Sequence, residues 1–201
     1  MALADLFTSS ADIAPDADPI LDAALEVFAD IGIRRATIND IADRARVGRV
    51  TVYRKIGGKN EILSAVMLRE AVRLFAAIRA AADAAETFPD RVANAFIATV
   101  TAIRGNPVWN RILELEPGTV LDQLTLNGQF ILAAAVEACV DVLRSPEIDL
   151  DDDELHARAE ILVRITHSIL LTPQVWIPLD TPEEITAFAR THLLTIAGPP
   201  R

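Results

Sequence analysis

Two short helical segments in the first third of the chain are separated by a turn of only three residues, Ala45-Arg46-Val47. The first segment is 38–44 and the second is about 48–55. Small apolar side chains recur at helical spacing in both segments and fit a steep packing of one helix on the other. Two short helices joined by so tight a turn are typical of a helix-turn-helix, whose second helix enters the DNA major groove. This pair constrains the fold more than any other feature of the sequence.

The start of the first segment carries a local signal of its own. Thr37 precedes the segment and Asp40 follows three residues later. This spacing predicts a capping box, with Asp in place of the usual Glu or Gln.

The rest of the chain also has helical periodicity, and Gly or Pro residues separate the runs. We expect an all-α fold of about nine helices without strands. Asp18 is the candidate N-cap of the first helix. The expected helices are 19–31, 38–44, 48–55, 59–85, 89–104, 107–115, 119–144, 151–171 and 183–197.

The net charge of −10 conceals an uneven distribution of charge. Residues 33–60 contain eight bases and two acids, whereas residues 1–32 contain seven acids and no base. The remaining residues, 61–201, contain eleven bases and twenty acids. A basic segment in an acidic chain is the footprint of a polyanion site, although a solvated basic face is the alternative on charge alone. Because the basic segment coincides with the helix-turn-helix pair, the sequence favours DNA.

Residues 20–66 resemble the DNA-binding domain of TetR-type transcriptional regulators. The matching text is Ile-Leu-Asp-Ala-Ala-Leu-Glu-Val-Phe-Ala-Asp-Ile-Gly (20–32), Ala-Thr-Ile-Asn-Asp-Ile-Ala (36–42), Val47, Thr51-Val52-Tyr53 and Gly-Gly-Lys-Asn-Glu-Ile-Leu (57–63). The resemblance implies a helix-turn-helix head at 19–65 and a helical regulatory domain at 66–201, which binds a ligand and dimerises. Residues 1–18 are expected to form a mobile acidic tail.

The resemblance also implies roles for individual residues of the head. Arg49, Val50 and Thr51 occupy the positions that face bases. An arginine can read guanine O6 and N7, and a Val or Thr methyl group can pack on a thymine methyl. The residues expected at DNA phosphates are Thr37, Arg46, Tyr53, Arg54, Lys55 and Lys59.

Three residues of the head depart from the family pattern. Arg46 replaces the usual turn glycine, so we expect a positive φ at a cost of roughly 1 kcal/mol. Gly48 replaces the usual serine cap, which weakens the cap by about a few tenths of a kcal/mol. Ile56 replaces the usual aromatic residue next to the recognition helix.

For the regulatory domain, the resemblance implies a homodimer and a pocket for a small molecule. Low charge within 92–103 and 124–140 suggests a small hydrophobic effector. The candidate pocket residues are Phe96, Val100, Arg104, Trp109, Asn127, Phe130, His167 and Trp176. The resemblance places the dimer contact on the last two long helices, about 155–171 and 183–197, and the sequence agrees in part, because these helices carry more apolar surface than a monomer exposes. The candidate interface residues are Ile161, Ile165, Ile169, Leu193 and Leu194.

The sequence offers little support for a metal, a cofactor or a catalytic centre. His156 and His167 are eleven residues apart, which is about 16 Å along a helix and too far for one metal ion. The acidic run that starts at Asp149 has Glu154 where a calcium loop needs glycine. Cys139 lies in an apolar run and is expected to be packed rather than reactive.

The predicted function is a ligand-responsive, dimeric transcriptional regulator, a repressor that binds a palindromic double-stranded DNA operator and is released by its effector. We expect no cofactor and no enzymatic activity. The chain lacks both a signal peptide and an apolar run that could span a membrane, so we expect a cytoplasmic protein without a membrane partner. The alternatives are a helical carrier or enzyme that keeps the head as structure only, and a protein-interaction adaptor without a ligand.

Overall fold

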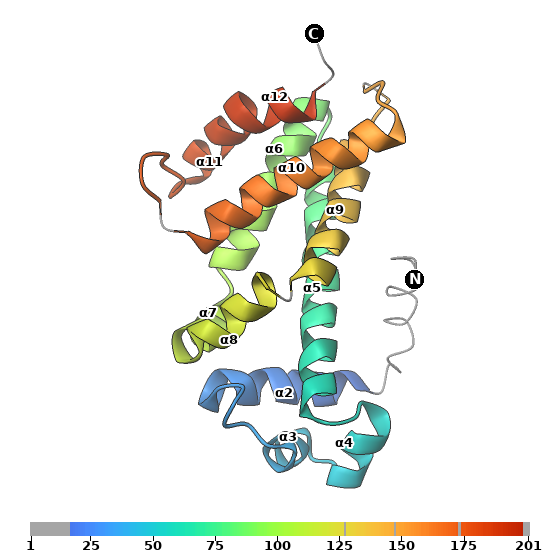
Figure 1. Ribbon diagram of the computed structural model, residues 1–201, viewed down its shortest axis with the longest axis vertical. Coiled ribbons are helices and arrows are strands. Elements are labelled where there is room, and N and C mark those ends of the chain that lie inside the picture. The colour runs from blue at the N-terminus through green and yellow to red at the C-terminus, as the bar shows by residue number, and fades with distance from the viewer. Residues whose placement is uncertain (1–16, 127, 147, 173, 199–201) are drawn as a thin grey trace. The chain divides into compact units, whose positions relative to one another are not determined.

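The computed structural model describes residues 17–198 except 127, 147 and 173. Every regular element among these residues is a helix, which confirms the all-α prediction (Figure 1). The α-helices in chain order are α2 (Asp18–Ile31), α3 (Ile38–Ala45), α4 (Arg49–Lys55), α5 (Lys59–Asp83), α6 (Phe88–Arg104), α7 (Pro107–Leu115), α8 (Pro117–Leu124), α9 (Gln129–Leu143), α10 (Asp152–Leu171), α11 (Pro182–Phe188) and α12 (Leu194–Ala197). A π-helical turn, Ala189–Leu193, joins the last two.

The chain forms two compact units. Unit 1 consists of Met1–Val72 and Asn106–Ile131, and unit 2 consists of Arg73–Gly105 and Leu132–Arg201. The segment 106–131, which the sequence analysis places in the regulatory domain, is therefore part of the compact unit that contains the helix-turn-helix.

The core of unit 1 joins α2, α3 and α4 to α5, α7 and α8. Phe28, Ile41 and Val52 are fully buried and hold the three short helices of the head together. Ile112 from α7 and Val120 from α8 lie in the same core. Truncating a buried Ile or Leu to Ala typically costs about 2–5 kcal/mol, so α7 and α8 contribute to the stability of the head.

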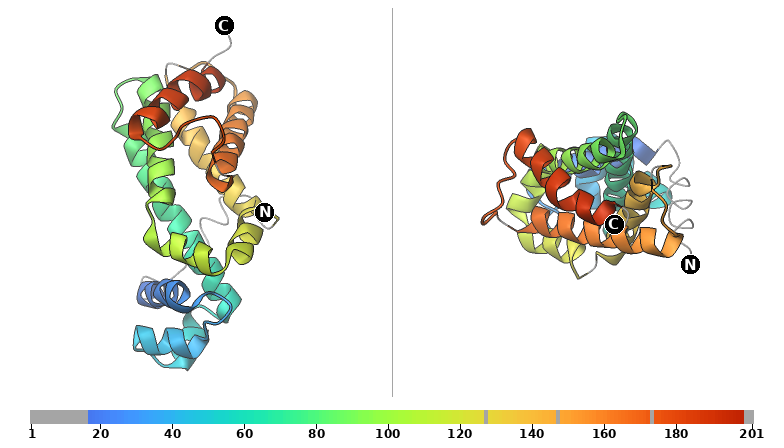
Figure 2. Two further views of the ribbon diagram at one scale, coloured as in Figure 1. Left: turned by 90° about the vertical axis from the view of Figure 1, so that its left-hand side faces the viewer. Right: turned by 90° about the horizontal axis from the view of Figure 1, so that it is seen from above.

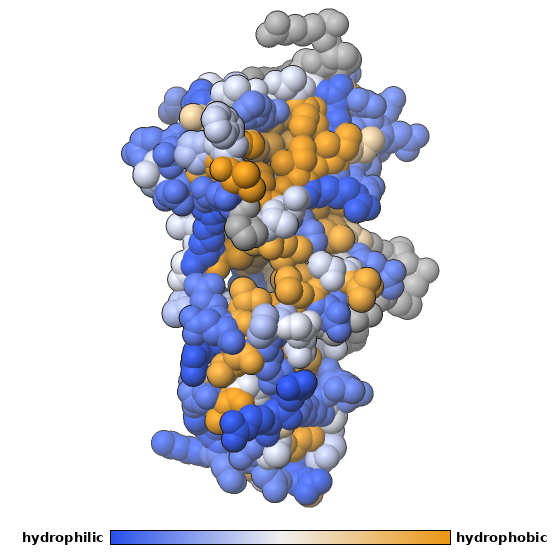
Figure 3. All heavy atoms as spheres, turned by 60° about the vertical axis from the view of Figure 1, so that its left-hand side comes forward, coloured by the Kyte–Doolittle hydropathy of each residue, from blue (hydrophilic) through white to orange (hydrophobic). Residues whose placement is uncertain are grey.

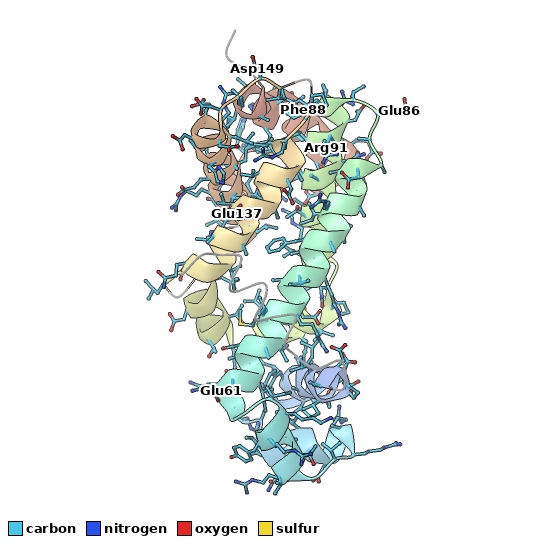
Figure 4. The ribbon with its side chains drawn as sticks, turned by 90° about the vertical axis from the view of Figure 1, so that its right-hand side faces the viewer. Glu61, Glu86, Phe88, Arg91, Glu137 and Asp149 are labelled. Atoms are coloured by element: carbon cyan, nitrogen blue, oxygen red, sulfur yellow. The ribbon has the colours of Figure 1, made fainter. Side chains whose placement is uncertain are left out.

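The core of unit 2 is centred on α6. Its side chains Phe96 and Val100 are buried among apolar residues of α9, α10, α11 and α12, and α11, the π-helical turn and α12 all contact α6 (Figure 2). Arg91 of α6 donates hydrogen bonds to the carbonyl groups of Val142, at 2.7 Å, and Asp141, at 3.2 Å (Figure 4). These carbonyls belong to the last turn of α9, where no intrahelical donor remains for them.

The expected helix at 119–144 is wrong, because this stretch contains two helices, α8 and α9. A Cβ atom on Gly128 would lie 2.5 Å from the carbonyl oxygen of Leu124, so the break between α8 and α9 contains a position that only glycine fits. The dipeptide Asn127-Gly128 is a turn signal that the continuous apolar pattern obscured. Pro117 occupies the first position of α8, two residues before the expected start at 119.

Two smaller corrections concern the chain ends. The N-cap of α2 is Ala17 and no side chain caps the helix, so Asp18 lies in the first turn rather than at the cap. The expected acidic tail otherwise lies outside the described residues. The expected last helix, 183–197, is interrupted by its π-helical turn. Within the described part of the chain, no helix has the length and apolar character needed to cross a membrane.

Candidate nucleic-acid interface and effector region

The first helix of the pair starts in the predicted capping box. The Asp40 backbone N–H donates to Thr37 Oγ1 at 3.2 Å, and the Thr37 backbone N–H donates to Asp40 Oδ2 at 2.9 Å. The Thr37 hydroxyl also donates to Asp40 Oδ2, at 2.7 Å. This hydroxyl bond, followed by the backbone bond, lowers the pKa of Asp40. The Thr37 hydroxyl proton is thus committed to Asp40, and a phosphate that used it would have to displace the carboxylate.

The turn between the helices has the backbone conformation predicted for Arg46. Its φ is 56° and its ψ is 40°, and it is the one non-glycine residue with positive φ in the described part of the chain. The Arg46 backbone N–H donates to the carbonyl of Asp43 at 3.2 Å and so closes the end of α3. The Arg46 side chain is exposed and forms no ion pair with another described residue.

The second helix, α4, is held by one buried residue and presents its other side chains outward. Val52 is fully buried in the core of unit 1. Arg49 and Val50 are exposed, the latter by 78%, while Thr51 is half-buried. Gly48 is the N-cap and provides no side-chain hydrogen bond, as the sequence predicts. Two of the three expected base-reading side chains are therefore exposed on the surface of the helix.

The basic residues of 33–60 differ in how far their charges are already neutralised. Arg44 donates to Glu26 Oε2 at 2.9 Å and to Asp30 Oδ2 at 2.6 Å. The bond to Asp30, and then the bond to Glu26, raises the pKa of Arg44. Arg54, in contrast, is exposed and has no ion pair with another described residue. Arg44 consequently stabilises the α2–α3 packing, whereas Arg46 on the turn and Arg54 on α4 keep their charges available to a polyanion.

Lys59 occupies the first position of α5. Its Nζ donates to the carbonyl oxygen of Arg34 at 2.8 Å, across the loop that precedes α3. An ammonium group has three donors, so this bond orients Lys59 and leaves donors for a phosphate.

Sequence reasoning missed Glu116, a residue between α7 and α8. Its carboxylate accepts the Arg34 backbone N–H at 2.6 Å and the Thr119 hydroxyl at 3.1 Å, and its side chain is only 8% exposed. The contact joins residues that are 82 positions apart in the chain. No local pattern indicates a contact of this kind, although the Gly32 that lies against the carboxylate is visible in the sequence as a helix end.

The structure does not gather the predicted pocket residues into one site. Phe96 and Val100 lie in the core of unit 2, whereas Trp109 packs against the core of unit 1. Trp176 is 92% exposed in the segment after α10, so it is not enclosed by the other candidate pocket residues in this structure. His167 is half-buried on α10. Asn127 and the side chain of Phe130 lie outside the described residues.

Arg104 does line a hollow in unit 2, which has a volume of about 410 Å³. Its Nη1 donates to the Leu179 carbonyl at 2.5 Å. The hollow is open to solvent and mixes apolar and polar side chains. Its lining residues are Arg104, Ile169, Leu170, Leu171, Thr172, Gln174 and Asp180.

The predicted dimer residues differ in their availability to a partner. Ile161 is 48% exposed, whereas Leu193 is 3% exposed and belongs to the core of unit 2. Ile165, Ile169 and Leu194 are half-buried against the same core. Figure 3 shows hydrophobic side chains gathered on one side of this unit. As the structure places them, the candidate interface residues with accessible surface are the three isoleucines and Leu194.

The rival metal and thiol sites gain no support in the described part of the chain. No group of three or more His, Cys, Asp or Glu side chains there could hold a metal ion. Burial raises the pKa of the Cys139 thiol to about 12, which suits a packed cysteine rather than a reactive one.

Comparisons with protein families identify two separate ranges of the chain. A model described as bacterial regulatory proteins of the tetR family matches residues 20–66. A second model, the C-terminal domain of the bacterial tetracycline repressor, matches residues 88–191, more than half of the chain. The chain belongs to the TetR family. It is accordingly a DNA-binding transcriptional regulator by family and not an enzyme.

Individual TetR-family proteins resemble the chain in sequence over the head and in fold over most of its length. The HTH-type transcriptional regulator SrpR of Pseudomonas putida is 50% identical over 48 residues, which are 24% of this chain and only 22% of SrpR. AlkX of Dietzia sp. strain DQ12-45-1b has a TM-score of 0.67 at 17% identity, with 89% of this chain and 96% of AlkX covered. QsdR of R. erythropolis has a TM-score of 0.62 at 19% identity, with 93% and 97% covered. Both solved structures show the shared TetR-family fold.

Proposed function

We propose that this TetR-family regulator is a dimeric repressor that binds a palindromic operator through α4 and leaves it when a small, largely apolar effector binds. The observation that carries the DNA-binding half of the proposal is the exposure of Arg49 and Val50 on a helix anchored by Val52. A side chain that projects from the start of α4 can reach base edges in a major groove.

The phosphate contacts follow from the charges around α4. Arg46 and Arg54 are exposed and unpaired among the described residues, and Lys59 is oriented at the start of α5. We assign these three residues, with Lys55 and Tyr53, to the DNA backbone, and we leave Thr37 to the capping box, because its hydroxyl and its backbone N–H both donate to Asp40. Contacts of this kind supply affinity and register, whereas Arg49, Val50 and Thr51 supply sequence preference.

The experiment is a selection of bound sequences from random duplex DNA, followed by a titration of the selected operator at several salt concentrations. We expect a palindromic consensus and a linear loss of log affinity with log salt, with a slope of about −0.9 for each phosphate contacted. Arg54→Ala should weaken all sequences alike, and Arg49→Ala should relax the preference at one base. Absence of duplex binding, or a flat salt response, would support a carrier that keeps the head as structure only.

The dimer is placed on α10 and on the α11–α12 pair, where Ile161 leaves half of its side chain in solvent. Ile161→Glu introduces a charge at this surface and should shift the protein to monomer in analytical ultracentrifugation. Leu113→Glu is the matched control, because Leu113 is similarly exposed but lies on α7. Equal behaviour of the two variants would place the interface elsewhere.

The effector is proposed to bind unit 2 with few polar contacts, of which Arg104 supplies one. A screen of hydrophobic metabolites for release of the operator tests this proposal. The Arg104→Gln variant should then need a higher concentration of the active compound for the same release. Release at an unchanged concentration would remove Arg104 from the effector site.

A further inference from the structure

We propose that Glu116 is a positioning residue for DNA binding, which fixes Lys59 and the entry to α3 through the backbone of Arg34. The proposal rests on the proposed function, because it assigns Lys59 to a DNA phosphate. It adds a residue outside the helix-turn-helix on which the geometry of the DNA-binding surface depends.

The carboxylate of Glu116 is built into unit 1. The residue is both the C-cap of α7 and the N-cap of α8, with φ −142° and ψ 62°. Its side chain is 8% exposed and accepts hydrogen bonds from the Arg34 backbone N–H and the Thr119 hydroxyl. A carboxylate removed from water depends on such donors, and a hydrogen bond to an ionised acceptor is about twice as strong as a neutral one.

The Arg34 residue is held from both sides. Its N–H donates to Glu116 Oε1 at 2.6 Å, and its carbonyl oxygen accepts from Lys59 Nζ at 2.8 Å. The Glu116 carboxylate and the Lys59 ammonium group therefore both bind the backbone of Arg34, three residues before the N-cap of α3 at Thr37. Moving the carboxylate would displace this stretch, and with it both the acceptor that orients Lys59 and the start of α3.

Gly32 makes the approach of the carboxylate possible. Its φ is +86°, and a Cβ atom at this position would lie 2.6 Å from Glu116 Oε1. Glycine is thus needed twice, for the backbone conformation that ends α2 and for the space that the carboxylate occupies.

The contact lies on a segment that leaves unit 2 and returns to it along the chain. The segment Asn106–Ile131, which contains Glu116, is connected at both of its ends to unit 2, through Gly105 and Leu132. Glu116 is the side chain through which that segment holds the loop before α3.

The test compares Glu116→Gln, which keeps the shape and removes the charge, with Glu114→Gln. Glu114 is an exposed carboxylate on α7 that pairs with Arg111, three residues away, and serves as the control. We expect Glu116→Gln to weaken operator binding about tenfold and to lower the magnitude of the salt slope by about one, because a neutral amide holds the Arg34 N–H more weakly than a carboxylate does and so loosens the backbone that orients Lys59. Glu114→Gln should bind like the wild type. The salt slope is the decisive readout, since a simple loss of stability would leave it unchanged.

A double-mutant cycle with Lys59→Met identifies the route of the effect. Glu116→Gln should weaken operator binding less in the Lys59→Met background than in the wild type, because the part of its effect that passes through Lys59 is already lost. Additive effects of the two substitutions would overturn the proposal, and so would wild-type binding by Glu116→Gln.

If Glu116→Gln does not fold, Thr119→Val takes its place, because it removes one donor to the same carboxylate. For Thr119→Val a reduced salt slope supports the proposal and an unchanged slope overturns it.

The two proposals fail in distinguishable ways. If the wild-type chain binds no duplex DNA, the proposed function fails. If the wild type binds DNA and Arg49→Ala relaxes its preference, but Glu116→Gln leaves affinity and salt slope unchanged, only the role of Glu116 fails.

Discussion

The guanidinium group of Arg49 lies against the ring of Tyr53, one turn further along α4. The Arg49 Cζ atom is 5.4 Å from the ring centroid, and its Nη2 donates to the Tyr53 hydroxyl at 3.5 Å. Both side chains are exposed. A cation held over an aromatic ring at an exposed site gains about 0.5–1 kcal/mol and is restricted in its orientations. The residue expected to read a base is thus partly ordered before DNA binds, which reduces the entropy lost on binding.

This pairing predicts different effects for two substitutions of Tyr53. Tyr53→Phe retains the ring under Arg49 and should weaken all DNA sequences uniformly through loss of the hydroxyl. Tyr53→Ala also frees Arg49, so it should additionally reduce discrimination at the base that Arg49 reads, by about two- to fivefold for a cation–π interaction of this size. Affinities for the operator and for single-base variants measure both effects. Identical specificity profiles for the two variants would show that the ring does not orient Arg49.

Arg46 offers a test of backbone strain. Arg46→Gly should stabilise the folded chain by up to about 1 kcal/mol, because glycine adopts a positive φ without the penalty of a Cβ atom. The midpoint of urea denaturation measures the effect. Arg46→Ala removes the same charge but keeps a Cβ atom at the positive φ, so this variant should be no more stable than the wild type. Equal midpoints for the two variants would attribute any change to the charge instead.

Gly48 is the position where a single substitution should improve the head. Its φ of −72° suits any residue, and a Cβ atom there would meet only Thr51 Oγ1, at 3.9 Å. Gly48→Ser should raise the free energy of unfolding by about a few tenths of a kcal/mol through a side-chain cap on α4. Gly48→Ala adds a Cβ atom at the same place but no hydrogen-bond acceptor for the first turn of α4, so it should lower the free energy of unfolding. A serine variant no more stable than the alanine variant would mean that the cap does not form.

The capping box of α3 predicts a dependence on pH. The pKa of Asp40 is lowered by its hydrogen bonds to Thr37, so this carboxylate stabilises the folded chain above the pKa it has when unfolded. The stabilisation is lost as the pH falls below about 4, through the lowered pKa of the folded state. Thr37→Val removes the hydroxyl, so the variant should be less stable at neutral pH and the difference from the wild type should shrink in acid. A difference that stays constant down to the acid transition would contradict this account.

Features of the head that depend on neighbouring residues were predictable from the sequence. The capping box follows from the residue types of Thr37 and Asp40 three positions apart, and the positive φ of Arg46 and the uncapped Gly48 follow from the family pattern at those two positions. The helix limits in this region agree closely for the same reason. In this region glycine and proline residues directly flank runs of apolar residues at helical spacing, so the ends of the helices are clear.

Other features depend on partners far away in the chain, and local patterns do not reveal them. The hydrogen bond from the Arg34 N–H to Glu116 joins two segments that lie 82 residues apart, and no sequence motif links them. In the sequence, Leu193 cannot be told apart from an apolar residue of a dimer interface, but in the structure it is buried in the core around α6. The turn at Gly128 was hidden because apolar residues continue on both sides of it. The candidate effector residues, chosen for type alone, fall in two separate units.

The division of the chain also affects how it can be engineered. The N-terminal family match ends at residue 66, which suggests a convenient point for exchanging effector domains between relatives. A chimera cut there would lose Ile112 and Val120, which complete the core of the head, together with the carboxylate that holds its loop. The portable DNA-reading module is therefore discontinuous. A functional graft has to carry residues 106–131 along with the motif, and a new sensor has to be inserted around them rather than appended.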